Sequence, residues 1–152
     1  MSESNSFWIR NLREVDVPAL LEIERSCFPD PWPVQWFKEP IRSRDICLGA
    51  CNGTKIIGYL ICCREDNVLH LANLAVDPEC RRQGVATALL NQVFQMTRNA
   101  RFSEVYLEVR RSNIEAIRIY ERYGFQITGV EEQYYQGSED ALIMKVKPNG
   151  LV

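Results

Sequence analysis

Hydrophobic residues recur along the chain with two different periods. Two-residue alternation and short apolar runs predict strands over residues 7–12, 46–51, 55–64, 68–76, 104–109, 125–130 and 141–146. Apolar residues at helical spacing predict helices over residues 16–27, 34–42, 83–97 and 114–123. The resulting order is strand, two helices, three strands, helix, strand, helix and two strands. It predicts an α/β fold on a mixed sheet, with a hairpin meander first and parallel crossovers later.

Turn and capping residues mark the ends of these elements. Asn52-Gly53 between two strand-like runs predicts a tight hairpin turn. Asp16 is expected to cap the first helix, with Pro18 in its first turn. Ser112 and Glu115 have the spacing of a capping box at the start of the last helix, and Gly124 is expected to end that helix in a left-handed conformation.

The segment Ala75–Leu90 carries the most specific chemical signal. It combines the end of a buried strand, a stop at Asp77-Pro78, a basic loop and a helix that begins on small residues. Free backbone N–H groups and the positive end of the helix dipole bind anions at such a start. Arg81 and Arg82 add positive charge beside it. The segment therefore predicts a site for a diphosphate.

Length and composition limit the class of protein. The chain has 152 residues, 46% of them hydrophobic and 25% charged, which is typical of one globular domain over 1–152. Residues 1–6 and 148–152 are expected to be loose tails. A net charge of −2 argues against direct nucleic-acid binding. No apolar run approaches the roughly 18 residues that span a membrane, and no signal peptide is recognised, so a cytoplasmic location is expected.

The six cysteines do not indicate a disulfide framework or a metal site. The sequence has no CxxC pair and one histidine, His70, so no metal is expected. Cys47, Cys51, Cys62 and Cys63 lie in strand-like segments and are expected to be small buried hydrophobes. Cys80, in the basic loop, is left open as an oxidisable thiol.

The run Arg81-Arg82-Gln83-Gly84-Val85-Ala86 fits the pattern [Q/R]-x-x-G-x-[G/A], and here it follows a predicted strand and opens a predicted helix. The chain resembles the GNAT superfamily of acetyl-CoA-dependent N-acetyltransferases, which carries this signature. Further blocks resemble the RimI-type ribosomal-protein-alanine N-acetyltransferases and related archaeal N-terminal acetyltransferases: Cys27–Trp32, Asn73–Pro78, Leu107–Asn113, Ala116, Tyr120-Glu121, Gly124-Phe125, Tyr134-Tyr135, Glu139–Ala141 and Met144. The resemblance implies an α-β-α fold with about four helices and a mixed, mostly antiparallel sheet of about seven strands, splayed at the acetyl-CoA site.

The resemblance also implies which residues bind acetyl-CoA. The backbone of Leu74, Ala75 and Val76 would pair with the pantetheine amides. The pyrophosphate loop would consist of Arg82, Gln83, Gly84, Val85, Ala86 and Thr87. Asn113 matches a later CoA-contacting asparagine, although the side chain of Asn113 could equally serve as a helix N-cap.

Glu108 matches the general base of the family and Tyr120 its general acid. In the strand 104–109, Tyr106 and Glu108 share one face, and Val105, Leu107 and Val109 share the other. Partial desolvation between Leu107 and Val109 would make the Glu108 carboxylate a better base. Two alternatives remain open: Glu108 could pair with Arg110 or be exposed, and Tyr120 could be a core residue.

The implied reaction transfers an acetyl group from acetyl-CoA to a protein N-terminal amine. The resemblance makes an N-terminal alanine of a ribosomal protein the leading target. An α-amino group near pKa 7.7–8.0 needs only a weak base such as Glu108. The aromatic and proline residues that could wall the peptide slot are Phe28, Pro29, Trp32, Trp36, Tyr134 and Tyr135. The alternatives are a small-molecule amine acetyltransferase on the same fold and a non-catalytic acyl-CoA-binding regulatory module.

Overall fold

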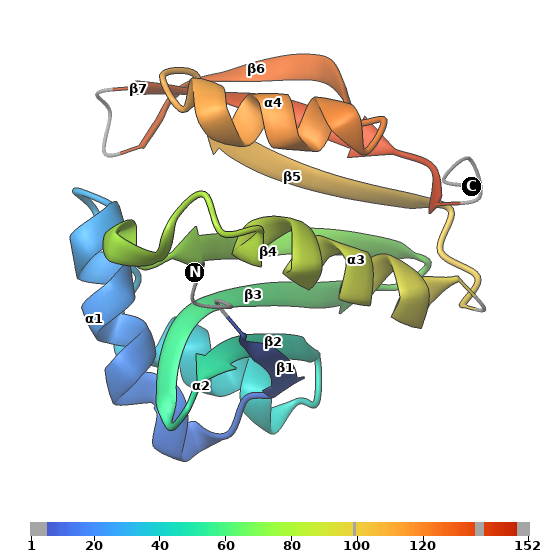
Figure 1. The fold of residues 1–152 in the computed structure, drawn as a ribbon. Helices are drawn as coiled ribbons and strands as arrows, with labels where there is room; N and C mark the ends of the chain where they lie inside the picture. The colour runs from blue at the N-terminus through green and yellow to red at the C-terminus, as the bar shows by residue number, and fades with distance from the viewer. Residues whose placement is uncertain (1–5, 99, 136–138, 149–152) are drawn as a thin grey trace. The chain divides into compact units, whose positions relative to one another are not determined.

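The computed structural model describes residues 6–98, 100–135 and 139–148. The strands are β1 (Trp8–Asn11), β2 (Ile46–Asn52), β3 (Lys55–Glu65), β4 (Val68–Val76), β5 (Glu104–Arg110), β6 (Gln126–Tyr135) and β7 (Glu139–Val146). The helices are α1 (Val17–Cys27), α2 (Val34–Arg42), α3 (Val85–Thr97) and α4 (Ile114–Arg122), with short 3₁₀ turns η1 (Glu14–Asp16) and η2 (Pro78–Cys80). The hydrogen-bonded strand order is β1-β2-β3-β4-β5-β7-β6. Figure 1 shows these elements along the chain.

The chain forms two compact units. The first unit comprises residues 1–62 and 73–93, and the second comprises residues 63–72 and 94–152. The described part of the first unit holds β1, β2, α1, α2, most of β3, the end of β4 and most of α3. The second holds the beginning of β4 together with β5, α4, β6 and β7. The predicted tails fall largely on 1–5 and 149–152, which lie outside the described residues.

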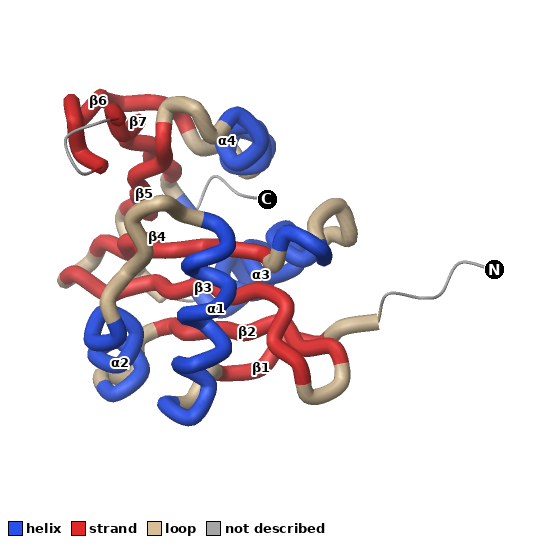
Figure 2. Tube along the Cα trace, turned by 90° about the vertical axis from the view of Figure 1, so that its left-hand side faces the viewer, coloured by secondary structure: helices blue, strands red, loops and turns tan. Residues whose placement is uncertain are grey.

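In the first unit, α2 and α3 cover opposite faces of the antiparallel strands β1, β2 and β3 (Figures 1 and 2). Neighbouring residues of β3 show why, because their side chains point to opposite faces. Tyr59 is fully buried and meets the ring of Phe37 from α2 at 5.5 Å. Gly58, the residue before it, faces Val85, the first residue of α3. The sheet is therefore packed on both sides.

In the second unit, β5 pairs with β7 and β7 with β6, both antiparallel. The beginning of β4 pairs in parallel with β5, with the register Val68–His70 against Glu104–Tyr106. Helix α4 lies over one face of these strands and buries Ile117 and Tyr120 (Figure 1). Strand β5 alternates strictly between buried and half-buried positions, which confirms the two faces predicted for it.

Most predicted elements match the structure within one or two residues, and α2 and β4 match in both bounds. The Asn52-Gly53 turn joins β2 and β3, and Gly124 has a positive φ of 91° after α4. The last two strands are longer than predicted, because β6 continues to Tyr135 against a β7 that begins at Glu139. The polar run after Val130 conceals this extension in the sequence.

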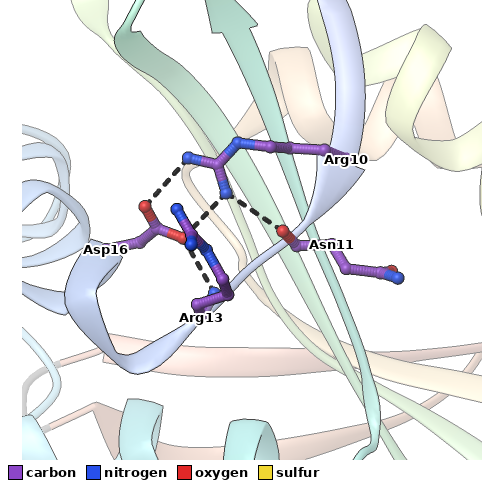
Figure 3. Close-up of polar contacts among 4 residues, drawn as sticks. All are labelled: Arg10, Asn11, Arg13 and Asp16. Atoms are coloured by element: carbon purple, nitrogen blue, oxygen red, sulfur yellow. Dashed lines mark hydrogen bonds and ion pairs between the residues drawn. The ribbon is translucent and has the colours of Figure 1, made fainter.

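Two predicted caps are wrong in detail. The side chain of Asp16 makes no capping bond to α1, because its carboxylate accepts hydrogen bonds from the Arg10 guanidinium at 2.8 and 2.9 Å and from the Arg13 backbone N–H at 2.8 Å. Figure 3 shows this cluster, in which Arg10 also reaches the carbonyl of Asn11. Helix α4 is capped by Asn113 rather than Ser112, with the Ala116 N–H donating to the Asn113 side chain at 3.3 Å.

Candidate active site

The predicted diphosphate loop lies in the first unit, between the end of β4 and α3. Strand β4 ends at Val76, and the N–H of the next residue, Asp77, donates to the Ile57 carbonyl of β3 at 2.8 Å. The Asp77 side chain then accepts from the Glu79 N–H at 3.0 Å and starts the turn η2, which the sequence did not predict. These bonds fix the point at which the loop leaves the sheet.

The loop enters α3 through backbone conformations that L-residues rarely adopt. Arg82 has a φ of 63° and Gly84 a φ of 78°. The Gly84 carbonyl accepts the first helical bond, from the Ala88 N–H at 2.9 Å. Closely spaced left-handed residues before a helix are typical of backbone sites that bind anions.

Gly58 holds the start of α3 close to the sheet. A Cβ atom placed on Gly58 would lie 2.9 Å from Val85 Cγ1 and 3.2 Å from the Ala75 carbonyl oxygen. Both distances are too short for a relaxed contact, and Val85 is itself 2% exposed and unable to move aside. A residue without a side chain in β3 thus sets the distance between α3 and the strand segment Leu74–Val76.

The two loop arginines differ in their contacts. The Arg81 guanidinium donates to the Cys27 sulfur at 3.3 Å and to the Val76 carbonyl at 3.4 Å, so it joins the end of α1 to the end of β4. The Arg82 side chain is exposed. From the sequence, both arginines are expected to add positive charge to the loop. In the structure, Arg81 also connects two elements through its hydrogen bonds.

The candidate base Glu108 lies in the second unit, on the half-buried face of β5. Its Oε2 lies 2.6 Å from Nε2 of His70, and both side chains are about one fifth exposed. The other ring nitrogen, Nδ1, lies 3.4 Å from Glu65 Oε2. The His70 ring stacks on Tyr106 with centroids 4.4 Å apart and an interplanar angle of 3°. The imidazole is thus held between two carboxylates.

The Tyr106 hydroxyl completes this cluster, because it donates to Glu65 at 2.8 and 2.9 Å. Burial and the neighbouring Glu65 raise the pKa of Tyr106, so its hydroxyl stays protonated. His70 was not predicted as a site residue, although alternation places it with Val68 on one face of β4. The alternation of residues does not give the register between β4 and β5, in which His70 lies opposite Tyr106.

Glu108 and Tyr120 have different surroundings. Arg110 contacts Glu139 at 3.1 Å and lies over the Tyr135 ring at 4.0 Å, while Glu108 contacts His70. Tyr120 is 6% exposed and its ring meets Phe125 edge-on at 5.6 Å. Tyr120 therefore packs in the core of the second unit, as its helical spacing indicated.

None of the six cysteines forms a disulfide. Cys47, Cys51 and Cys62 are buried as predicted, while Cys63 is half-buried. Burial raises the pKa of the Cys80 thiol, which makes it a weaker nucleophile at neutral pH. Within the described residues, no group of three or more His, Cys, Asp or Glu side chains is arranged so that it could hold a metal ion. No helix in that part of the chain is long and apolar enough to cross a membrane.

Comparison with known proteins gives the class to which this fold belongs. Residues 17–125 match the Acetyltransferase (GNAT) family. The chain is 32% identical to the [ribosomal protein bS18]-alanine N-acetyltransferase of Escherichia coli K12 over 90% of its length and 94% of that protein. It is 31% identical to the N-alpha-acetyltransferase of Saccharolobus solfataricus over 93% of both chains.

The solved structures agree with these sequence relationships. The crystal structure of the Escherichia coli ribosomal-protein-S18-alanine N-acetyltransferase superposes with a TM-score of 0.86 at 31% identity, covering 93% of this chain and 94% of that one. Fold and sequence together define an acetyltransferase. The chain belongs to the GNAT family, as the signature at residues 81–86 implied.

Proposed function

We propose that the protein transfers the acetyl group of acetyl-CoA to the α-amino group of a protein N-terminus, and that an N-terminal alanine of a ribosomal protein is its substrate. Relatives that cover nearly the whole chain carry this activity in their names. The observation that carries the proposal is the contact between Glu108 and His70, because it supplies a base suited to a weakly acidic ammonium group.

The donor is bound mainly by backbone groups. Leu74, Ala75 and Val76 pair with the pantetheine amides as a neighbouring strand would. The diphosphate lies against the loop Arg82–Thr87, where Gly84 permits the turn and the N–H groups at the start of α3 point to the anion. Asn113 contributes through its backbone or its amide N–H₂ group, since its side-chain oxygen already caps α4.

The chemical steps follow from what an amine and a thioester require. The ammonium group loses a proton to the Glu108 carboxylate, directly or through one water, and the free amine attacks the thioester carbon. The C–S bond then breaks, and the departing CoA thiolate takes a proton from Tyr120. His70, in contact with Glu108 and Glu65, gives the proton on Glu108 a route away from the site. The remaining catalysis is positioning.

We further propose that residues 1–152 form a single catalytic domain and that the enzyme acts in the cytoplasm, where ribosomal proteins are made. The residues proposed for the peptide slot are all wholly or partly exposed: Phe28, Pro29, Trp32, Trp36, Tyr134 and Tyr135.

A panel of peptides tests the substrate class. CoA release is measured with peptides that begin with Ala, Ser, Met or Gly, and with a blocked peptide that carries one internal lysine. We expect the alanine peptide to have the highest kcat/KM and the lysine peptide to be at least about tenfold poorer, because the lysine amine is about two pKa units harder to deprotonate. Equal activity on the lysine peptide would contradict the proposal, and a preference for small free amines would favour a small-molecule enzyme.

A further inference from the structure

Glu24 is a buried carboxyl group that the proposed reaction does not use. It lies on α1 and is 2% exposed. One oxygen, Oε1, accepts hydrogen bonds from the Tyr59 hydroxyl and from Asn73 Nδ2, the latter at 2.8 Å. The other, Oε2, accepts from the Trp32 backbone N–H at 2.9 Å. A carboxyl group so far from water is stable only because both of its oxygens are bonded.

These contacts fix the segment Phe28–Pro33 at both ends. Its three prolines leave N–H groups only on Phe28, Asp30 and Trp32. The Phe28 N–H donates to the Glu24 carbonyl at 3.0 Å, and the Trp32 N–H donates to the Glu24 carboxyl group. A single residue therefore accepts two of the three backbone donors of the segment.

The same residue connects this segment to the strand assigned to acetyl-CoA. Asn73, which is 9% exposed, immediately precedes Leu74–Val76 in β4, and its amide donates to Glu24. Burial, followed by the neighbouring Glu24, raises the pKa of Tyr59, so its hydroxyl remains a donor at every physiological pH. A second hydrogen bond between α1 and β4 runs from the Cys27 thiol to the Val76 carbonyl, at 3.3 Å.

Aromatic packing also holds the Trp32 side chain in place. The Trp32 ring meets Phe37 at 5.1 Å and Trp36 at 5.8 Å. Phe37 is fully buried, whereas Trp36 is 55% exposed. The buried Phe37 ring restrains Trp32, and the exposed Trp36 ring leaves an aromatic surface that a ligand can contact.

We propose that Glu24 is a positioning residue for the acceptor: it holds Phe28–Pro33 in place against the strand Leu74–Val76, so that the bound N-terminus meets the thioester in one orientation. This inference rests on the proposed function, because it takes Phe28, Pro29 and Trp32 as part of the acceptor slot. Misplacement of a reacting group by about 1 Å is enough to lower a rate about 100-fold.

The test replaces Glu24 and compares two matched controls. Glu24→Gln keeps the shape but turns an N–H₂ group toward one of the donors. Glu22→Gln makes the same change at an exposed position of the same helix. Tyr59→Phe removes one donor to Oε1 but leaves the Trp32 contact, so it reports loss of stability without loss of loop position.

For Glu24→Gln we expect kcat/KM for the alanine peptide to fall about 10–100-fold, with KM for acetyl-CoA changed less than about twofold. Hydrogen exchange at the Trp32 amide should become at least about tenfold faster. Glu24→Asp, which keeps the carboxyl group, should recover part of the peptide activity. Glu22→Gln should behave as the wild type, and Tyr59→Phe should lower the melting temperature without changing the peptide kcat/KM.

An unchanged peptide kcat/KM in Glu24→Gln would overturn the inference, and so would an equal loss in Tyr59→Phe with the Trp32 exchange rate unchanged. Failure of the proposed function is recognised separately, because the wild type itself would then not acetylate peptide N-termini. The exchange measurement needs no substrate. Unchanged exchange at Trp32 in both Glu24 variants overturns the loop-holding role whatever the enzyme acetylates.

Discussion

The proposed donor-binding region and the proposed catalytic face of this protein differ in the groups that form them. The proposed donor-binding region, from Leu74 to Thr87, offers mainly backbone groups. Its conformation depends on glycines at positions 58 and 84, where a side chain would be crowded or would strain the turn. The cluster of His70, Tyr106 and Glu108 uses side chains from two strands, and His70 lies 38 positions before its carboxylate partner Glu108. A site made of backbone groups is formed by one short, continuous segment, so it can be recognised in the sequence. A side-chain site depends on which strands become neighbours, and in which register.

The largest expected effect is on the side-chain region. Glu108→Gln keeps the shape of the side chain but removes the base, so kcat/KM for a peptide N-terminus should fall about 10²–10⁴-fold. Steady-state CoA release at pH 7 measures this loss. Glu104→Gln, at the start of the same strand and paired with Lys145 at 3.6 Å, is the control and should change the rate little. A Glu108→Gln enzyme with wild-type activity would remove this residue from the mechanism.

The backbone region should respond through the donor instead. Gly84→Ala places a side chain on a residue with φ of 78°, which costs about 1–2 kcal/mol, and relaxation of the turn should raise KM for acetyl-CoA about tenfold. Gly53→Ala is a close control, since Gly53 has φ of 62° and, like Gly84, no atom within 4 Å of an added Cβ. Both variants should lose similar stability, but only Gly84→Ala should bind acetyl-CoA more weakly. Equal KM values in the two would show that the loop does not contact the donor.

The smallest effect on activity is expected at Asp16, a carboxylate with a structural contact. Hydrogen bonds from Arg10 lower its pKa in the folded protein, and the Arg13 N–H adds to this (Figure 3). Because the folded pKa lies below the unfolded value, the stabilisation is fully present above about pH 4 and is lost as the pH falls through the folded pKa. Asp16→Asn should lower the free energy of unfolding at pH 7 by about 1–3 kcal/mol and leave kcat unchanged.

Urea unfolding at a series of pH values measures this effect. The difference between the wild type and Asp16→Asn should shrink on acidification, because protonation removes the same charge that the substitution removes. A constant difference from pH 7 to pH 3 would mean that the ion pair is not what Asp16 contributes. Loss of activity in the folded variant would instead give this carboxylate a role beyond stability.

The sequence predicted the elements and turns that depend on the local pattern of residues. Helix α2 follows from its spacing and from the prolines before it, and the β2–β3 hairpin follows from Asn52-Gly53. The loop before α3 was found because glycine and small residues at fixed positions have a direct backbone meaning. Long-range pairing was not accessible. His70 was seen only as a lone histidine, and Asp16 as a cap, because the arginine that binds Asp16 lies in a different element.

The buried network around Glu24 shows the same limit. Glu24, Tyr59 and Asn73 come from α1, β3 and β4, and none of them stands out in its own segment. An acidic residue near the end of an amphipathic helix usually faces water. Only the tertiary packing of these elements buries the Glu24 carboxyl group, and both of its oxygens must then accept hydrogen bonds from protein groups.

Gly58 has a consequence for how this enzyme tolerates change. It lies in the middle of β3, within neither the signature loop nor the catalytic face, yet a single methyl group there meets Val85 and the Ala75 carbonyl at once. In a scan of all single substitutions, position 58 should rank among the most sensitive, and donor binding should decline in step with the size of the new side chain. We therefore expect a residue other than glycine at position 58 to be tolerated only where the start of α3 has moved away from the sheet.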